Sequence, residues 1–290
     1  MAIGGNDLTI VFHGVRGSTP CHGPEVQRYG GNTSCVSIAA PGEDPLVFDL
    51  GTGARYFGAT LDPSVQRLNV LVSHLHWDHI QGLPFLPQLQ CDHCEINVWA
   101  PVQDDGRSAR DCFTAAIAQP VFPVALDSIG AQIAIHDVAL REWEIGSFTV
   151  RAAEVPHIGP TLGYRVTYCG HSVVYVSDHQ EPADPNSFAP NVLNLCEEVD
   201  VLIHDAQFVD SDFVGREHWG HCRIDYAFSL AIAARVSTLV LFHHDPSRSD
   251  DELDAIEADY QRRGAEAGID VVVAREGMTM TIPCHADNHA

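Results

Sequence analysis

Three histidines and one aspartate occur within residues 74–79, which read HLHWDH. His74 and His76 are two residues apart, so in an extended chain their side chains point to the same side and can bind one cation. Asp78 and His79 follow where we expect a helix to begin, and there they can face a second cation. The segment predicts half of a metal site. The alternative is a histidine-rich surface turn, since the chain contains 17 histidines.

The type of ligand does not select the metal. Imidazole and carboxylate groups suit zinc, and they also bind iron and manganese. The other half of the site must come from elsewhere in the chain.

The residues around HLHWDH predict a sheet protein with polar groups at strand ends. Residues 68–73 (LNVLVS) form an apolar run typical of a buried strand, which places His74 at the end of that strand. Eleven such runs are found along the chain, and several end at a residue that can bind a metal. Helical periodicity is clearest over residues 224–235 and 250–264, and residues 128–150 are expected to form strands and turns.

The order of these elements predicts an α/β protein with two sheets, each followed by helices. A single doubly wound sheet would require longer helices between the strands of the first half. Because the sequence has no internal linker, low-complexity tract or repeat, we expect one domain over residues 1–290.

Composition restricts the partners and the compartment. A formal net charge of −23 disfavours long nucleic acids, whose binding relies on basic residues, and favours a small substrate. The nine cysteines are scattered and odd in number, which does not suit a disulfide framework. The N-terminus lacks the features of a signal peptide, and no apolar run is long enough to cross a membrane. We therefore expect a cytoplasmic protein without a membrane partner.

The segment HLHWDH resembles the HxHxDH signature of the metallo-β-lactamase fold hydrolases. The resemblance implies an αββα sandwich, with two mixed β-sheets flanked by helices and a two-metal centre at the rim between the sheets. It also implies three further ligands in a fixed order: a histidine, a bridging aspartate and a final histidine. Candidates occur in that order at the ends of strand-like runs, namely His157, Asp178 and His243.

Carried over to this sequence, the resemblance implies two divalent cations, which we expect to be zinc, with manganese or iron(II) as alternatives. The first cation would be bound by His74, His76 and His157, and the second by Asp78, His79 and His243, with Asp178 between them. A hydroxide held by both cations would be the nucleophile. The last ligand is either His243 or His244, and we favour His243 because it directly follows an apolar strand.

Asp49 ends another apolar run, LVFD. In the resembled family an aspartate at this place orients a ligand, as carboxylates behind metal-bound imidazoles do in general. It can also cap the helix expected after residues 51–53. Both interpretations stay open at this point.

The segments VLIHDAQF and WGHCRIDY resemble paired motifs of the ribonuclease Z and small phosphodiesterase branch. There an acidic residue supports a histidine that stabilises or protonates the leaving group, and Asp205 and His221 match these positions. Together with Asp78 they are the expected catalytic residues. The alternative for His221 is an ordinary residue at the entry of a helix. His204 is more consistent with a buried structural histidine. Arg223 either contacts phosphate or opens the next helix.

The N-terminal segment FHGVRGSTP and the following RYGGNTSCV also resemble this branch. Arg16, Asn32 and Thr33 are candidate substrate contacts, and simple turn architecture is the alternative.

One difference from ribonuclease Z restricts the class of substrate that we expect. Bacterial forms insert a basic arm for transfer RNA between the third-motif histidine and the bridging aspartate. Between His157 and Asp178 this chain has only 20 residues, enough for two strands and a turn at residues 168–172. We therefore expect a phosphodiesterase that acts on a small anion of the cyclic-nucleotide or cyclic-phosphate type. The alternatives are a thioesterase or lactonase, and a metal-binding sensor without catalysis.

Two stretches have no assigned role. Cys91, His93 and Cys94 (CDHC) are either isolated side chains or part of a third metal site. Residues 88–126 form either a wall of the substrate site or a contact between the subunits of a homodimer.

Overall fold

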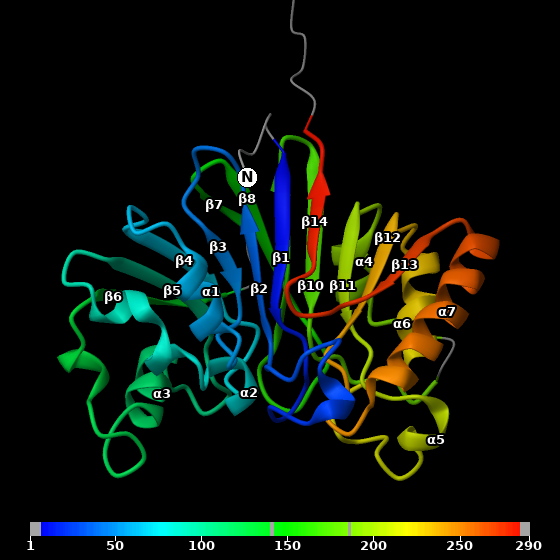
Figure 1. Ribbon diagram of the computed structural model, residues 1–290, viewed down its shortest axis with the longest axis horizontal. Helices are drawn as coiled ribbons and strands as arrows, with labels where there is room; N and C mark the ends of the chain where they lie inside the picture. Colours follow the sequence, from blue (N-terminus) through cyan, green and yellow to red (C-terminus); the bar gives the residue numbers. More distant parts are fainter. Residues whose placement is uncertain (1–6, 140–141, 185–186, 285–290) are drawn as a thin grey trace, which may run out of the picture.

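Two seven-stranded sheets lie face to face, with helices on their outer sides (Figure 1). The computed structural model describes residues 7–139, 142–184 and 187–284. The predicted αββα sandwich with two mixed sheets is confirmed, and all eleven predicted strands are present. Within the described ranges, every helix is too short or too polar to cross a membrane.

The first sheet is built from the N-terminal half of the chain and completed by the last strand. Its order is β14 (Thr279–Ile282), β1 (Leu8–Gly14), β2 (Cys35–Ala39), β3 (Leu46–Phe48), β4 (Arg67–Leu71), β5 (Glu95–Pro101) and β6 (Gln132–Val138). The second sheet has the order β13 (Asp270–Val273), β12 (Thr238–Phe242), β11 (Val201–Asp205), β10 (His171–Val176), β9 (Leu162–Tyr168), β8 (Phe148–Glu154) and β7 (Glu142–Ile145).

The helices cover the outer faces of the two sheets and the end of the sandwich at which the polar strand ends lie. They are α1 (Ala54–Thr60), α2 (Trp77–Ile80), α3 (Ala109–Ala116), α4 (Pro190–Cys196), α5 (Asp210–Phe213), α6 (Ile224–Ala233) and α7 (Asp250–Ala267). Short 3-10 turns occur at η1 (Pro24–Val26), η2 (Leu83–Phe85), η3 (Pro87–Gln90) and η4 (Leu126–Ser128). The two helices predicted from periodicity, over residues 224–235 and 250–264, are therefore confirmed. Ser249 and Glu252 form a capping box at the start of α7.

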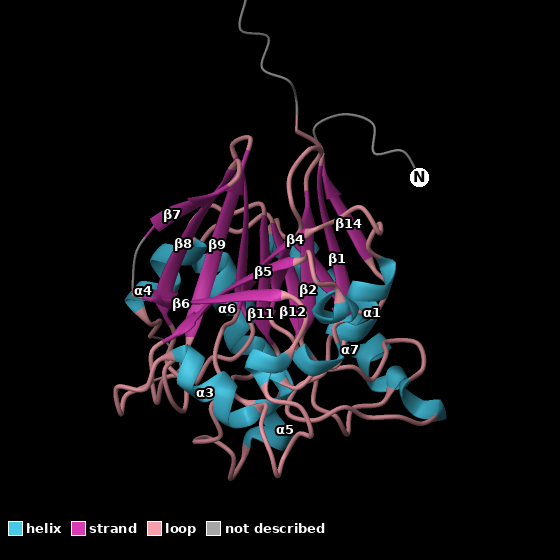
Figure 2. Cartoon of the chain, turned by 90° about the vertical axis from the view of Figure 1, so that its left-hand side faces the viewer, coloured by secondary structure: helices cyan, strands magenta, loops and turns pink. Residues whose placement is uncertain are grey.

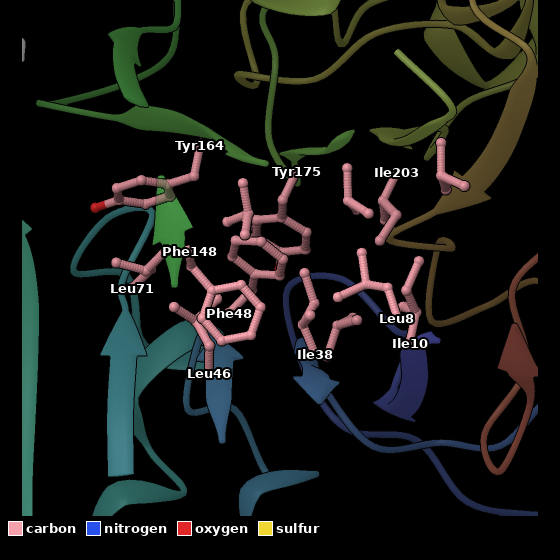
Figure 3. Packing of buried hydrophobic residues seen from close by; sticks show 14 of the residues in the cluster. Leu8, Ile10, Ile38, Leu46, Phe48, Leu71, Phe148, Tyr164, Tyr175 and Ile203 are labelled. Carbon is pink, nitrogen blue, oxygen red and sulfur yellow. The ribbon is translucent and has the colours of Figure 1, made fainter. Parts of the chain in front are cut away.

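Aromatic side chains from the facing sheets hold the sandwich together (Figure 3). Phe48 of β3 stacks on Tyr175 of β10, with ring centroids 4.7 Å apart. Tyr164 of β9 is buried among these rings, and its hydroxyl donates to the carbonyl of Val72 at 2.7 Å. A buried phenol needs such a partner. This hydrogen bond joins the second sheet to the segment that leads into HLHWDH.

Strand direction brings the polar strand ends together. In the first sheet β3 and β4 are parallel, and in the second sheet β10, β11 and β12 are parallel. β8 runs in the same direction as β10, because both are antiparallel to β9. The loops and short helices that follow the strands lie beyond one end of the sandwich, away from the start of β1 and the end of β14 (Figure 2). Sites in α/β proteins commonly form at the carboxyl ends of parallel strands.

Candidate metal centre

The first cluster of ligand atoms comes from two strand ends. His74 and His76 follow β4, and His157 follows β8. His76 Nδ1 lies 2.9 Å from His74 Nε2 and 3.2 Å from His157 Nε2. Three imidazole nitrogens thus converge on one point, and these are the three residues that the resemblance implies for the first cation.

The second cluster joins the short helix α2 to the end of β12. Asp78 and His79 are buried in α2, and His243 follows β12. Asp78 Oδ2 lies 3.2 Å from His79 Nε2 and 3.2 Å from His243 Nε2. The backbone N–H of Ser18 also donates to Asp78 Oδ2, at 2.7 Å.

Asp178, which follows β10, lies between the two clusters and presents one oxygen to each. Its Oδ2 is 3.8 Å from His74 Nε2 and 3.9 Å from His157 Nε2. Its Oδ1 is 3.1 Å from His79 Nε2 and 3.5 Å from His243 Nε2. This is the arrangement that a carboxylate needs to bridge two cations.

Two atoms of these clusters require a partner that the protein does not provide. Among the described residues, His79 Nε2 and Asp178 Oδ1 are buried without a hydrogen bond. Leaving such atoms unpaired is costly. Burial, reinforced by the neighbouring imidazoles, holds the pKa of His74 well below its usual value, so that its ring is a neutral ligand. The donor set therefore fits two divalent cations of the zinc, manganese or iron type.

Hydrogen-bond acceptors on the side of each ring away from the clusters determine which imidazole nitrogen faces a cluster. His79 Nδ1 donates to Asp49 Oδ2 at 2.7 Å, and His157 Nδ1 donates to the carbonyl of Gly220 at 2.6 Å. His243 Nδ1 lies 3.0 Å from Gln207 Oε1. These oxygens only accept, so each Nδ1 carries the proton and each Nε2 keeps its lone pair for a metal.

Asp49 orients the site and does not cap a helix. Its carboxylate accepts from Ser73 N at 2.7 Å, Ser73 Oγ at 2.8 Å and Tyr175 OH at 2.7 Å, in addition to His79. The N-cap of α1 is Gly53, and it has no side-chain cap. Of the two interpretations of Asp49, the capping interpretation is wrong.

Asp205 and His221 form a buried pair beside the bridging aspartate. His221 Nδ1 lies 3.1 Å from Asp205 Oδ2 and 3.6 Å from Asp178 Oδ2. Burial lowers the pKa of His221, but the charges of Asp205, Asp178 and Asp78 outweigh it and raise the pKa to about 9. Asp205 is itself held by the backbone N–H groups of residues 179 and 207, at 3.0 and 3.1 Å.

The structure separates His243 from its neighbour. The ring of His244 turns away from both clusters, and its Nε2 donates to the carbonyl of Ala274 at 2.8 Å. Of the two candidate last ligands, only His243 lies beside Asp78 and Asp178.

Two other candidates, His204 and Arg223, have structural partners. His204 is fully buried and bonded to His179 Nδ1 at 3.0 Å, as expected for a structural histidine. Arg223 precedes α6 and pairs with Glu181 and Asp210. That arrangement favours its opening the helix over its contacting phosphate.

The three N-terminal candidates form hydrogen bonds that stabilise turns. Arg16 is fully buried and donates to the carbonyls of Gly30, Asp245 and Arg248 at 2.8, 3.1 and 2.8 Å. Asn32 Nδ2 donates to the Glu276 carboxylate, and Thr33 Oγ1 accepts from the backbone of Thr52. The turn interpretation is favoured for all three.

The CDHC segment gathers no metal ligands. Cys91 is half-buried, Cys94 is buried and His93 is exposed. Within the described part of the chain, the groups of side chains that can hold an ion consist of the two clusters above together with Asp178 and His221, and none of them includes a residue of CDHC.

The connection between His157 and Asp178 is short, as predicted. β9 and β10 are joined through Cys169 and Gly170, which both have positive φ, 48° and 80°. Two such residues form the tight hairpin turn that suits adjacent antiparallel strands. The structure has no inserted arm between these strands.

Three supporting groups were not singled out from the sequence: the N–H of Ser18, the Gln207 side chain and the Gly220 carbonyl. Gln207 and Gly220 lie inside the quoted segments HDAQF and WGHC. Their histidine partners are 36 and 63 residues away, so no local pattern identifies the pairing.

Comparisons with known proteins agree with this arrangement. The model of the beta-lactamase superfamily domain matches residues 47–244. The ribonuclease Z of Natronomonas pharaonis is 25% identical, over 95% of this chain and 98% of that protein. The metallo-beta-lactamase fold protein YhfI from Bacillus subtilis has a TM-score of 0.70 and 19% identity, over 96% of this chain and all of that one. A diphosphatase from the PhnP family has a TM-score of 0.66 and 17% identity, over 95% and 97% of the two chains.

Proposed function

Since the chain belongs to the beta-lactamase superfamily, we propose that it is a dinuclear metal-dependent phosphodiesterase that hydrolyses a small phosphodiester. The observation that carries the proposal is the pair of Asp205 and His221 beside the bridging carboxylate of Asp178. Cleavage of a carboxylic ester or thioester at the same metals does not need this pair.

The two clusters would hold one divalent cation each. His74, His76 and His157 would bind the first, and Asp78, His79 and His243 would bind the second, with Asp178 available to both. When bound, the cations supply Lewis-acid activation of water and neutralise charge on the phosphate oxygens.

A side chain of this protein moves one of the protons. The oxygen of one water molecule bonds to phosphorus, and the bond from phosphorus to the leaving oxygen breaks. The proton that the water loses passes to the solvent. His221, held through Nδ1 by Asp205, donates a proton to the leaving oxygen, so that the products are a phosphomonoester and an alcohol.

Three observations support a small substrate over transfer RNA. The hairpin of β9 and β10 leaves no arm between His157 and Asp178. The alignment with the Natronomonas enzyme has 330 positions and this chain 290 residues, so at least 40 positions (330 − 290) have no counterpart here. All 16 basic residues are arginines in a chain of net charge −23, which makes a polyanion an unfavourable partner.

The proposal is tested by metal analysis together with a substrate panel. The panel contains bis-p-nitrophenyl phosphate, 2′,3′-cyclic nucleotides, an acyl thioester, a lactone and a precursor transfer RNA. We expect two metal ions per chain and turnover of the small phosphodiesters that stops with a chelator and with Asp78→Ala. Turnover of the thioester or lactone alone would replace the proposal with a carboxyl hydrolase, and metal binding without any turnover would replace it with a sensor.

A further inference from the structure

An apolar cavity of about 190 Å³ adjoins the helix that carries two of the proposed metal ligands. Its walls come from α2, η2 and α3 and from the loop after α3, which belongs to residues 88–126. Among the described residues, four of the ten that line it are aromatic and five are aliphatic, and Gln81 is the only one with an amide, hydroxyl or charged group. The residues that matter for its shape are Trp77, Phe85, Phe113, Val121 and Phe122.

Helix α2 couples this cavity to the metal clusters. Asp78 and His79 are buried on the side of the ligands, whereas Trp77, between His76 and Asp78, lines the cavity. One turn of helix advances about 5.4 Å, so the cavity and the clusters are neighbours. Gln81, just after α2, is fixed by its amide, whose Nε2 lies 3.4 Å from Thr33 Oγ1.

Three large apolar side chains that line the cavity are exposed to solvent. Trp77 is 67% exposed, Phe85 59% and Val121 59%. Phe85 and Phe122 already pack edge to face, with ring centroids 6.0 Å apart at 86°. Large apolar side chains that gather around a concave site beside polar groups are typical of a ligand pocket.

We propose that this cavity binds an aromatic ring on the non-leaving ester group of the phosphodiester. The inference rests on the proposed function and names the substrate class: a diester with one aryl or nucleoside group. A cavity of about 150 Å³ is enough for benzene, so a volume of 190 Å³ accepts one ring. Aromatic walls offer that ring stacking and edge-to-face contacts.

The basic residues of the protein also favour apolar contact as the source of affinity for the remote part of the substrate. The chain has no lysine, and Arg16, Arg223 and Arg248, which lie in the quoted motifs or contact one of them, are each bonded to acceptors of the protein. Arg216 lies 3.5 Å from the carboxylate of Asp245. Beyond the metals, these arginines are not free to hold a second phosphate. Binding energy for the remote part of the substrate must therefore come from apolar contact.

The test compares diesters that share the leaving group p-nitrophenolate and differ in the other ester: methyl, phenyl and 5′-thymidyl. We expect the metal-loaded protein to prefer the phenyl over the methyl ester in kcat/KM by roughly tenfold or more, since a buried ring contributes about that much. The thymidyl ester distinguishes a nucleoside from a simple aryl group. Phe85→Ala and Trp77→Ala, at exposed positions that the fold tolerates, should each lower the ratio several-fold.

The control variant is Ile232→Ala, which removes an exposed apolar side chain of α6 on the far side of the second sheet and should leave the ratio unchanged. Binding of phenylphosphonate and methylphosphonate, followed by calorimetry, gives a second readout that needs no turnover. If no diester is hydrolysed, the proposed function fails, and a preference for phenylphosphonate that Phe85→Ala removes would still support the pocket.

Two results would overturn the inference. One is an equal preference for both phosphonates and both esters in the unaltered protein. The other is a dimer, detected by sedimentation velocity, that Phe85→Asp dissociates while the phenyl-to-methyl ratio stays the same in Phe85→Ala. In that case the cavity is a contact between two copies of the chain.

Discussion

Asp49 Oδ2 lies 2.7 Å from His79 Nδ1, and both side chains are fully buried. The same carboxylate accepts hydrogen bonds from Ser73, which follows β4, and from Tyr175 of β10. One buried anion therefore joins the two sheets to a ligand of the second cluster. The position of His79 therefore depends on a carboxylate that lies outside both clusters.

Asp49→Asn should weaken binding of the second cation. The carboxylate receives four donors, and an amide presents an NH₂ to at least one of them. Asparagine suits the positive φ of this residue, 57°, so the backbone is not the cause of any effect. We expect a loss of 10- to 100-fold in affinity, measured by titration against a competing chelator. The exposed Asp62→Asn is the control, and equal affinity in both variants would contradict this role.

Gly220→Ala should weaken binding of the first cation. A Cβ at this position would lie 2.4 Å from His157 Cε1, so the ring must move away from the cluster. Gly215→Ala is the matched control, because it has a similar φ of 81° and open space around it. Both variants carry a backbone cost of about 1–2 kcal/mol, but only Gly220→Ala should lose one metal ion per chain by elemental analysis. Equal metal content in the two would refute the contact.

His221→Ala should keep both metal ions and lose most turnover. His221 Nδ1 bonds to Asp205, so removing the ring leaves the ligand set in place. We expect kcat to fall roughly 10²- to 10⁴-fold for a small diester, as for loss of a proton donor. His218→Ala, in the same loop and exposed, should have no effect. Full metal content with unchanged turnover would remove His221 from the mechanism.

His13 should make stability depend on pH below neutrality. Its ring contacts Phe57 and bonds to Ser37 Oγ at 2.8 Å, and burial lowers its pKa from 6.5 to about 4. Between these values the unfolded chain takes up a proton that the folded ring excludes. The contribution is full above pH 6.5 and is lost as the pH falls toward 4.

From pH 7.5 to 5.0 this loss amounts to about 2 kcal/mol of unfolding free energy. His13→Gln keeps a hydrogen-bonding side chain and removes the titration, so its urea unfolding should show a smaller difference between the two pH values. An identical pH dependence in both proteins would show that His13 is not responsible.

The sequence predicted the strands and the segments with candidate ligands better than it predicted the residues that hydrogen-bond to those ligands. Apolar runs that end at His74, Asp178 and His243 are local features, and the strand ends are where we expected them. β14 was not predicted, because its four residues, TMTI, are too short a run to identify a strand and gain their stability from pairing with β1. Several short helices were also missed, since their formation depends on tertiary packing.

What the sequence left open depends on contacts between distant residues. The two interpretations of Asp49 and the choice between His243 and His244 differ only in which way a side chain turns. Residues 88–126 could not be placed because no local pattern says which loop meets α2. That the whole chain forms one domain, and that the seven clustered side chains bind metal, stay predictions for the experiments above.

The last strand of the chain has a consequence for synthesis. β14 pairs with β1, the first strand, after the entire second sheet has been made. Until residues 279–282 leave the ribosome, one side of β1 has no neighbour in its own sheet, and an open strand edge invites pairing with other chains. The sheet that is begun first is therefore completed last, and nascent or C-terminally truncated chains should be the forms of this protein most prone to aggregation.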